Sequence, residues 1–143
     1  MTLTELLIGL TILAILTGLA APAAVQLADR LAVEHQAARI LAAYQQARTI
    51  ALTAMAPVRL AVAADRMTIH RLGAGVGPAD SVLAWEAAGP ARDGVALRTA
   101  PGPVLFAPSG ITTGAGNGRY ELEKGGVRRA VVASRLGRLR IER

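Results

Sequence analysis

The sequence predicts an α+β fold in which a long N-terminal helix packs on a small antiparallel β-sheet domain. The first observation is a continuous apolar stretch near the N-terminus that passes directly into an amphipathic helical pattern. The second is that most of the 15 glycines and 7 prolines follow residue 72, where they separate short segments rich in Val, Leu and Ile. With 143 residues and only 3% aromatic side chains, the chain predicts one domain with an aliphatic core.

The apolar stretch covers residues 6–28 and contains no charged side chain. A helix rises about 1.5 Å per residue, so this length can cross a hydrocarbon core of about 30 Å. A cleaved secretory signal would begin with basic residues, yet the first basic residue is Arg30. A buried core helix is disfavoured, because a domain this small cannot surround a helix that is apolar on every side. A membrane-spanning segment is the preferred interpretation, with the carboxylate of Glu5 at its start.

From residue 29 the helical pattern becomes amphipathic. Apolar residues recur at steps of three or four along one face, at Val33, Ala37, Ile40, Tyr44, Ala47, Ala51 and Met55. Pro22 lies inside the long helix and is expected to kink it, and Pro57 is expected to end it. We therefore divide the chain into a hydrophobic helix at 1–28, its amphipathic continuation at 29–56 and an antiparallel β domain at 57–143.

The β domain is predicted from short apolar segments bounded by turn residues. Pairs such as Gly89-Pro90 and Gly125-Gly126 mark the turns between these segments. The expected strands are at 58–63, 67–72, 81–86, 94–98, 103–107, 119–123, 127–134 and 138–142.

The net charge of +6 is concentrated at the C-terminus. The last sixteen residues contain only one acid, Glu142, and six arginines, at positions 128, 129, 135, 138, 140 and 143. Two interpretations remain open at this point: a solvated basic edge, or a surface that binds a polyanion.

The opening MTLTELLIGLTILAIL resembles the N-terminus of mature type IV pilins and of the pseudopilins of type II secretion. The resemblance rests on Met1, Thr2, Leu3, Glu5, Leu6 and Leu7, with Pro22 in the usual place. It implies that a leader peptidase has removed a leader before Met1, and that the new amine is free or N-methylated. It also implies that Glu5 pairs with the Met1 amine of a neighbouring subunit during assembly. A carboxylate in an apolar zone is costly without such a partner.

The remainder resembles the GspH/FimT group of minor pilins and pseudopilins. The matching segments are 57–60 (PVRL), 104–111 (VLFAPSGI) and 129–140 (RAVVASRLGRLR). The resemblance implies a pilin fold and a structural subunit that polymerises into a filament through its N-terminal helix. The expected partners are other pilin subunits, the inner-membrane assembly machinery and membrane lipid. The expected location is the bacterial inner membrane, with a single pass and the C-terminal domain outside the cytoplasm, and then a periplasmic or extracellular filament.

Two alternatives to a purely structural minor subunit remain open: the main subunit of a type IV pilus, and a minor pilin that binds DNA for uptake. The second comes from Gly137-Arg138-Leu139-Arg140, which matches the GRxR ending that contributes to DNA binding in some members of the group. Side chains two apart on a strand share a face, so Arg138 and Arg140 could reach phosphates together. The candidate DNA-binding residues are Arg138 and Arg140, with Gly137 as the turn, together with Arg128, Arg129 and Arg135.

No catalytic, cofactor or metal site is expected. His35 and His70 are far apart in the sequence and lack Cys or acidic companions at ligand spacing. The glycine-rich segment 73–78 neither opens a helix nor has the spacing of a dinucleotide-binding loop. We therefore expect no enzymatic function.

Overall fold

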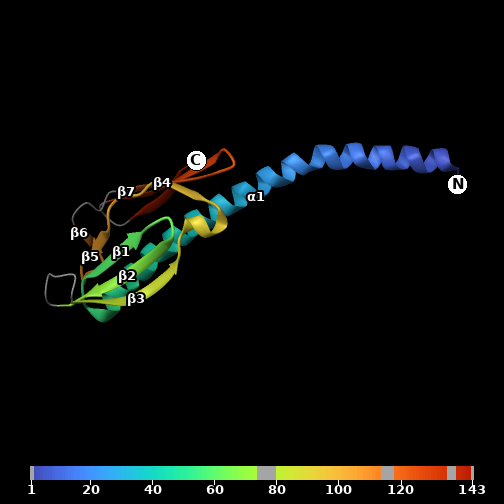
Figure 1. Cartoon of the computed structure of the whole chain (residues 1–143). Helices are drawn as coiled ribbons and strands as arrows, with labels where there is room; N and C mark the ends of the chain where they lie inside the picture. The colour runs from blue at the N-terminus through green and yellow to red at the C-terminus, as the bar shows by residue number, and fades with distance from the viewer. Residues whose placement is uncertain (1, 74–79, 114–117, 135–137, 143) are drawn as a thin grey trace.

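The computed structural model describes residues 2–73, 80–113, 118–134 and 138–142. One helix, α1 (Leu3–Ala54), forms the N-terminal third of the chain, and its N-terminal part projects away from the β domain in Figure 1. Thr2 is its N-cap, and Met55 ends it in the left-handed conformation with φ 48°. The helix continues through Pro22, and α1 curves along its length in Figure 1.

The strands form two antiparallel sheets. In chain order they are β1 (Val58–Val62), β2 (Arg66–Leu72), β3 (Ser81–Ala88), β4 (Ala96–Thr99), β5 (Val104–Phe106), β6 (Thr112–Thr113), β7 (Gly118–Lys124), β8 (Val127–Ala133) and β9 (Leu139–Glu142). The first sheet has the order β3-β2-β1-β5-β6 and the second has the order β4-β7-β8-β9. A short 3₁₀ helix, η2 (Pro90–Asp93), lies between β3 and β4.

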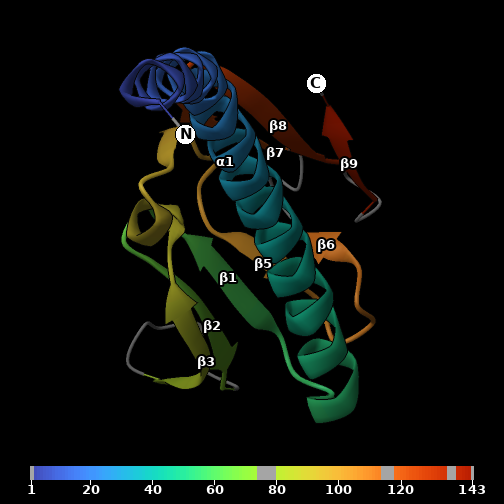
Figure 2. The same ribbon diagram turned by 90° about the vertical axis from the view of Figure 1, so that its right-hand side faces the viewer.

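The second half of α1 packs across both sheets and joins them, as Figure 2 shows. The buried helix face contains Val33, Ala37, Ile40, Tyr44, Ala47 and Ala51, in agreement with the predicted stripe. From the sheets, Leu60 and Ile69 of the first and Leu122 and Val131 of the second complete this core. The described side chains of residues 2–28 are all exposed.

The predicted α+β architecture of a long helix on antiparallel β structure is confirmed, and three details differ. The β structure is divided into two sheets, the two-residue strand β6 and the helix η2 were not anticipated, and Met55 does not belong to the core. Met55 is 76% exposed because α1 ends at Ala54 and the left-handed turn directs the chain away from the helix face.

Candidate assembly helix and basic strand edge

The first turn of α1 is capped by its own side chains. The backbone N–H of Thr2 donates to Glu5 Oε2 (2.8 Å), and the Glu5 N–H donates to Thr2 Oγ1 (3.4 Å). This reciprocal pair is a capping box, and it places a carboxylate at the positive end of the helix dipole. Its signal, Thr-x-x-Glu, is present in the sequence but was not among the predicted features. Met1 lies outside the described residues, so its predicted pairing with Glu5 stays a prediction.

The surface around Glu5 is apolar. Leu3 is 79% exposed, and Leu6, Leu7 and Ile8 are each more than half exposed. The polar side chains farther along bond within the helix: Thr11 Oγ1 donates to the Leu7 carbonyl (2.7 Å). This part of α1 is long and apolar enough to cross a membrane, and none of its described side chains is buried in the β domain.

The junction between this exposed part and the β domain is polar. Asp29 lies 3.6 Å from Lys124 Nζ, which also donates to the Asp93 carbonyl (2.9 Å). The buried Gln36 amide donates to the Asp93 carboxylate, so η2 is bonded to α1. These contacts fix the position at which α1 leaves the domain.

The candidate DNA-binding arginines occupy different environments. Arg138 and Arg140 are exposed, and together with Val132, Ser134, Leu139 and Glu142 they line a groove of about 360 Å³ beside β9. The backbone of Arg138 bonds to Ser134, whose Oγ accepts from the Arg138 N–H at 3.2 Å. Within the described part of the chain, neither arginine has an acidic side chain within ion-pair distance. Arg135 and Gly137 lie outside the described residues.

Arg128 and Arg129, by contrast, are paired with acids. Arg129 Nη2 lies 3.2 Å from Glu34 Oε1 on α1, and Arg128 Nη2 lies 3.3 Å from Glu123 Oε1 on β7. Successive side chains of a strand point to opposite faces, so these two arginines do not form one surface on β8. Arg129 faces α1, whereas Arg128 shares the outward face with Arg140 but is paired there with Glu123.

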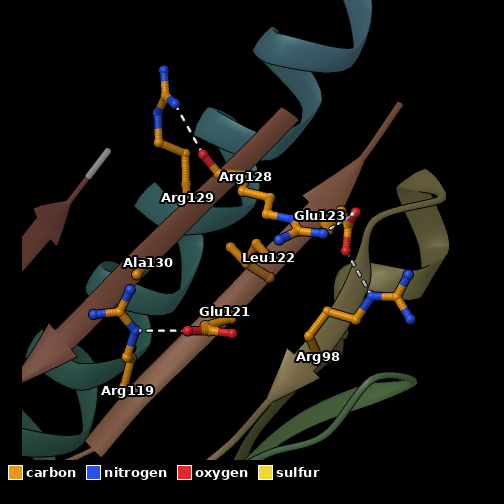
Figure 3. Close-up of a pocket in the computed structure, with 8 residues that line it drawn as sticks. All are labelled: Arg98, Arg119, Glu121, Leu122, Glu123, Arg128, Arg129 and Ala130. Carbon is orange, nitrogen blue, oxygen red and sulfur yellow. Dashed lines mark hydrogen bonds and ion pairs between the residues drawn. The ribbon is translucent and has the colours of Figure 1, made fainter. Parts of the chain in front are cut away.

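The outward face of the second sheet carries alternating charges around a groove of about 430 Å³ (Figure 3). Arg98 Nε lies 2.8 Å from Glu123 Oε2, and Arg119 lies 2.8 Å from Glu121 Oε1 and 3.2 Å from Glu142 Oε2. The hydrogen bond from Arg98 is the main cause that lowers the pKa of Glu123. This face was not predicted, although the period-two spacing of Arg119, Glu121 and Glu123 indicates a charged strand face.

Among the described residues, no group of three or more His, Asp or Glu side chains could hold a metal ion. His35 lies 3.6 Å from Asp93, while His70 is on β2 of the first sheet. The groove in Figure 3 is lined by paired arginines and glutamates rather than by an acid–base arrangement.

The fold is similar to that of the type IV minor pilin FimU of Pseudomonas aeruginosa strain PAO1, with a TM-score of 0.57 at 16% sequence identity. The match covers 78% of this chain and 88% of the FimU chain. No curated protein matches the sequence. The family model described as type II transport protein GspH matches residues 36–137, which include the second half of α1 and the strands up to β8. The chain therefore belongs to the GspH family.

Proposed function

We propose that this chain is a minor pilin or pseudopilin that polymerises into a type IV filament through residues 1–28. The observation that supports this most directly is the apolar half of α1, whose described side chains are all exposed. A surface of that size is unfavourable in water, and a bilayer or a bundle of similar helices would remove it from water. The same segment therefore serves first as a membrane anchor and then as the filament core.

Glu5 and Met1 are the residues that we propose for assembly. Among the described residues, the Glu5 carboxylate accepts hydrogen bonds only from Thr2, in its own first turn. The amine of Met1 on a neighbouring subunit, free or N-methylated, would supply the opposite charge once helices come together in a medium of low dielectric constant. The Pro22 segment would adjust the curvature of α1 as the helices bundle.

We also propose the orientation in the membrane. Met1 lies towards the cytoplasm after leader peptidase cleavage, and residues from about 30 onwards lie outside it in the inner-membrane form. Protease added to spheroplasts should then digest the β domain, while a protected domain would show the opposite orientation.

The test of the assembly function is Glu5→Ala in the full chain. We expect membrane insertion to be unchanged, because the substitution removes a charge from the apolar zone, and incorporation into sheared filaments to be lost. Glu34→Ala is the matched control, since Glu34 is an exposed acid of the same helix beyond the apolar segment. Normal incorporation of Glu5→Ala would exclude Glu5 from assembly, and absence of the wild-type chain from filaments would contradict the proposed function.

A second candidate function is DNA binding at β9, and the pair Arg138 and Arg140 favours it. These two exposed arginines lack acidic partners among the described residues, unlike Arg128 and Arg129. Changing both to Gln should weaken binding of duplex DNA by the detergent-solubilised chain and reduce its salt dependence. For each phosphate that the variant no longer neutralises, the log–log slope should change by about 0.9. The control is the double change Arg98→Gln and Arg128→Gln, which alters arginines already paired with Glu123. Equal binding by the β9 variant and the wild type would contradict this function.

A further inference from the structure

Strand β3 is an unusual sheet edge. It has 8 residues, whereas the other edge strands are shorter: β4 and β9 have 4 each and β6 has 2. Exposed sheet edges are normally short, charged or covered, because their free backbone groups can pair with another chain. β3 carries one charged residue, Glu86, while Val82 is 56% exposed and Leu83 is 49% exposed. Its length and apolar character indicate an edge that a partner covers.

The backbone groups of Glu86 point to the outer edge of β3. The Gly89 N–H donates to the Asp65 carbonyl at 2.8 Å, which identifies a hydrogen-bonded pair between β3 and β2. Bonded and non-bonded pairs alternate along antiparallel strands, so the backbone groups of Ala88 and Glu86 point away from β2. The Ala88 carbonyl agrees with this, since it accepts from Arg39 Nη2 at 2.9 Å. In the described part of the chain, no strand pairs with this edge of β3.

Glu86 lies on the sheet face that points away from α1. Strand register places Glu86 opposite Thr68, and Thr68 opposite Ala61. Ala61 alternates with Leu60 and Val62, which are buried. Side chains that are opposite one another share a face, so Glu86 is on the outward face.

Val82 lies on the other face of β3. It is opposite Arg71, which is opposite the buried Val58. Val82 therefore lies on the same side of the sheet as α1, but near the end of the strand, where the helix does not cover it. The outer edge of β3 thus presents an acid outward and an apolar side chain inward.

The edge of β9 has the complementary arrangement. Arg140 is opposite Val132, which alternates with the buried Val131 and Ala133, so Arg140 points away from α1. Ile141 is opposite Val131, faces the α1 side and is 44% exposed. The β9 edge therefore presents a base outward and an apolar side chain inward.

The two edges lie on opposite flanks of α1, with β3 on one side and β9 on the other in Figure 2. Two copies with parallel helices can therefore place β3 of one beside β9 of the next. Pairing of β3 with β3 would require a twofold axis, which either reverses one helix or moves it to the opposite face of the sheets. It would also bring two Glu86 side chains together. A contact between two different edges avoids both problems and can repeat along a helical filament.

We propose that the outer edge of β3 docks against the β9 edge of a second copy of this chain. In this contact Glu86 faces Arg138 and Arg140 on the outward face, and Ile141 faces the apolar residues of β3 on the inward face. The parallel arrangement of the helices rests on the proposed filament function, while the complementarity of the edges does not. The arginines of β9 would then contact protein in an assembled copy, and DNA would reach them only where β9 has no neighbour.

Disulfide cross-linking tests this contact. The chain contains no cysteine, so any disulfide that forms joins the introduced cysteines. Full-length Glu86→Cys is produced in membranes together with full-length Arg140→Cys or Arg138→Cys, followed by mild oxidation. We expect a dimer from at least one mixed pair and none from Glu86→Cys alone. Arg98→Cys replaces the β9 variant as the control, since Arg98 is exposed on β4. A mixed yield no higher than this control, or a dominant Glu86→Cys homodimer, would overturn the proposal.

Charge reversal separates this contact from filament assembly itself. Glu86→Arg should lower incorporation into filaments, and Arg140→Glu in the same chain should restore it. If Glu86→Arg is incorporated normally while Glu5→Ala is not, the β3 contact is wrong and the filament function stands. If the wild-type chain enters no filament but its edges still cross-link, the proposed function is wrong and the edge contact stands.

Discussion

The phenolic oxygens of Tyr44 on α1 and Tyr120 on β7 lie 3.0 Å apart in the core. Their rings meet edge to face, and Tyr44 makes a second contact of this kind with Phe106 on β5. Tyr44 therefore joins both sheets to the helix. One hydroxyl donates its proton to the oxygen of the other. Removing either hydroxyl therefore leaves the remaining one without this hydrogen-bond partner.

This pairing predicts non-additive effects of mutation. Tyr44→Phe or Tyr120→Phe alone leaves a buried hydroxyl without its partner, which should lower the free energy of unfolding by about 1–3 kcal/mol. The double variant should cost less than the sum of the two, because neither hydroxyl then remains. Chemical denaturation of all four proteins in the same detergent measures the coupling, and strictly additive effects would contradict it.

The same pair predicts resistance to alkaline titration. Burial raises the pKa of Tyr120 above its ordinary value of 10.0, and burial likewise raises the pKa of Tyr44. Groups with raised folded-state pKa values contribute stability that is complete below pH about 10 and is lost as the pH rises further. The chain contains only 2 tyrosines, so tyrosinate absorbance reports this pair. It should appear together with unfolding, and titration near pH 10 in a folded protein would show that the hydroxyls are accessible.

The turn between β7 and β8 offers a matched pair of glycine substitutions. Gly125 and Gly126 both have positive φ, at 55° and 79°, where side chains are disfavoured. Gly126→Ala meets no atom and should cost about 1–2 kcal/mol from backbone strain alone. Gly125→Ala should cost more, because its Cβ would collide with the carboxyl group of Asp29, which pairs with Lys124. Equal costs, measured by thermal unfolding, would mean that the turn does not pack on α1 as described.

The position at which α1 enters the domain predicts where the chain can be shortened. A fragment starting at Asp29 retains the buried face from Val33 to Ala51 and the contact of Asp29 with Lys124, so it should be soluble without detergent. A fragment starting at residue 56 exposes the inner faces of both sheets and should be insoluble. Gel filtration without detergent tests both, and aggregation of the longer fragment would contradict the division at residue 28.

The outward face of the second sheet predicts a loss of stability in acid. Because the Arg98 hydrogen bond lowers the pKa of Glu123 below its ordinary value of 4.5, the pair contributes above that pH and is lost as the pH falls through the lowered value. Glu123→Gln should therefore lower the melting temperature slightly at neutral pH and leave it nearly unchanged in acid, which flattens the decline between the two. An unchanged acid profile would mean that solvent screens this exposed network completely.

Local patterns in the sequence were sufficient to predict the long helix, its buried face and most of the strands. The stripe from Val33 to Ala51 was readable because the helical period of 3.6 residues brings these positions to one side. Strand β8 was readable from its apolar residues between turn glycines, and Gly125-Gly126 marks the turn before it. Each of these signals depends on residues that are close together in the chain.

Tertiary structure alone decided which elements pair and which charges are neutralised. The sequence could not divide the strands between two sheets, because the period-two pattern assigns a face to a side chain but names no neighbouring strand. Arg129 and Arg140 are indistinguishable by composition, yet Arg129 pairs with Glu34, 95 residues earlier, and Arg140 has no acidic partner among the described residues. That difference arises because β8 passes beside α1 while β9 is the last strand of its sheet. Ion pairs and free edges are set by distances between segments remote in sequence, which only the packed chain fixes.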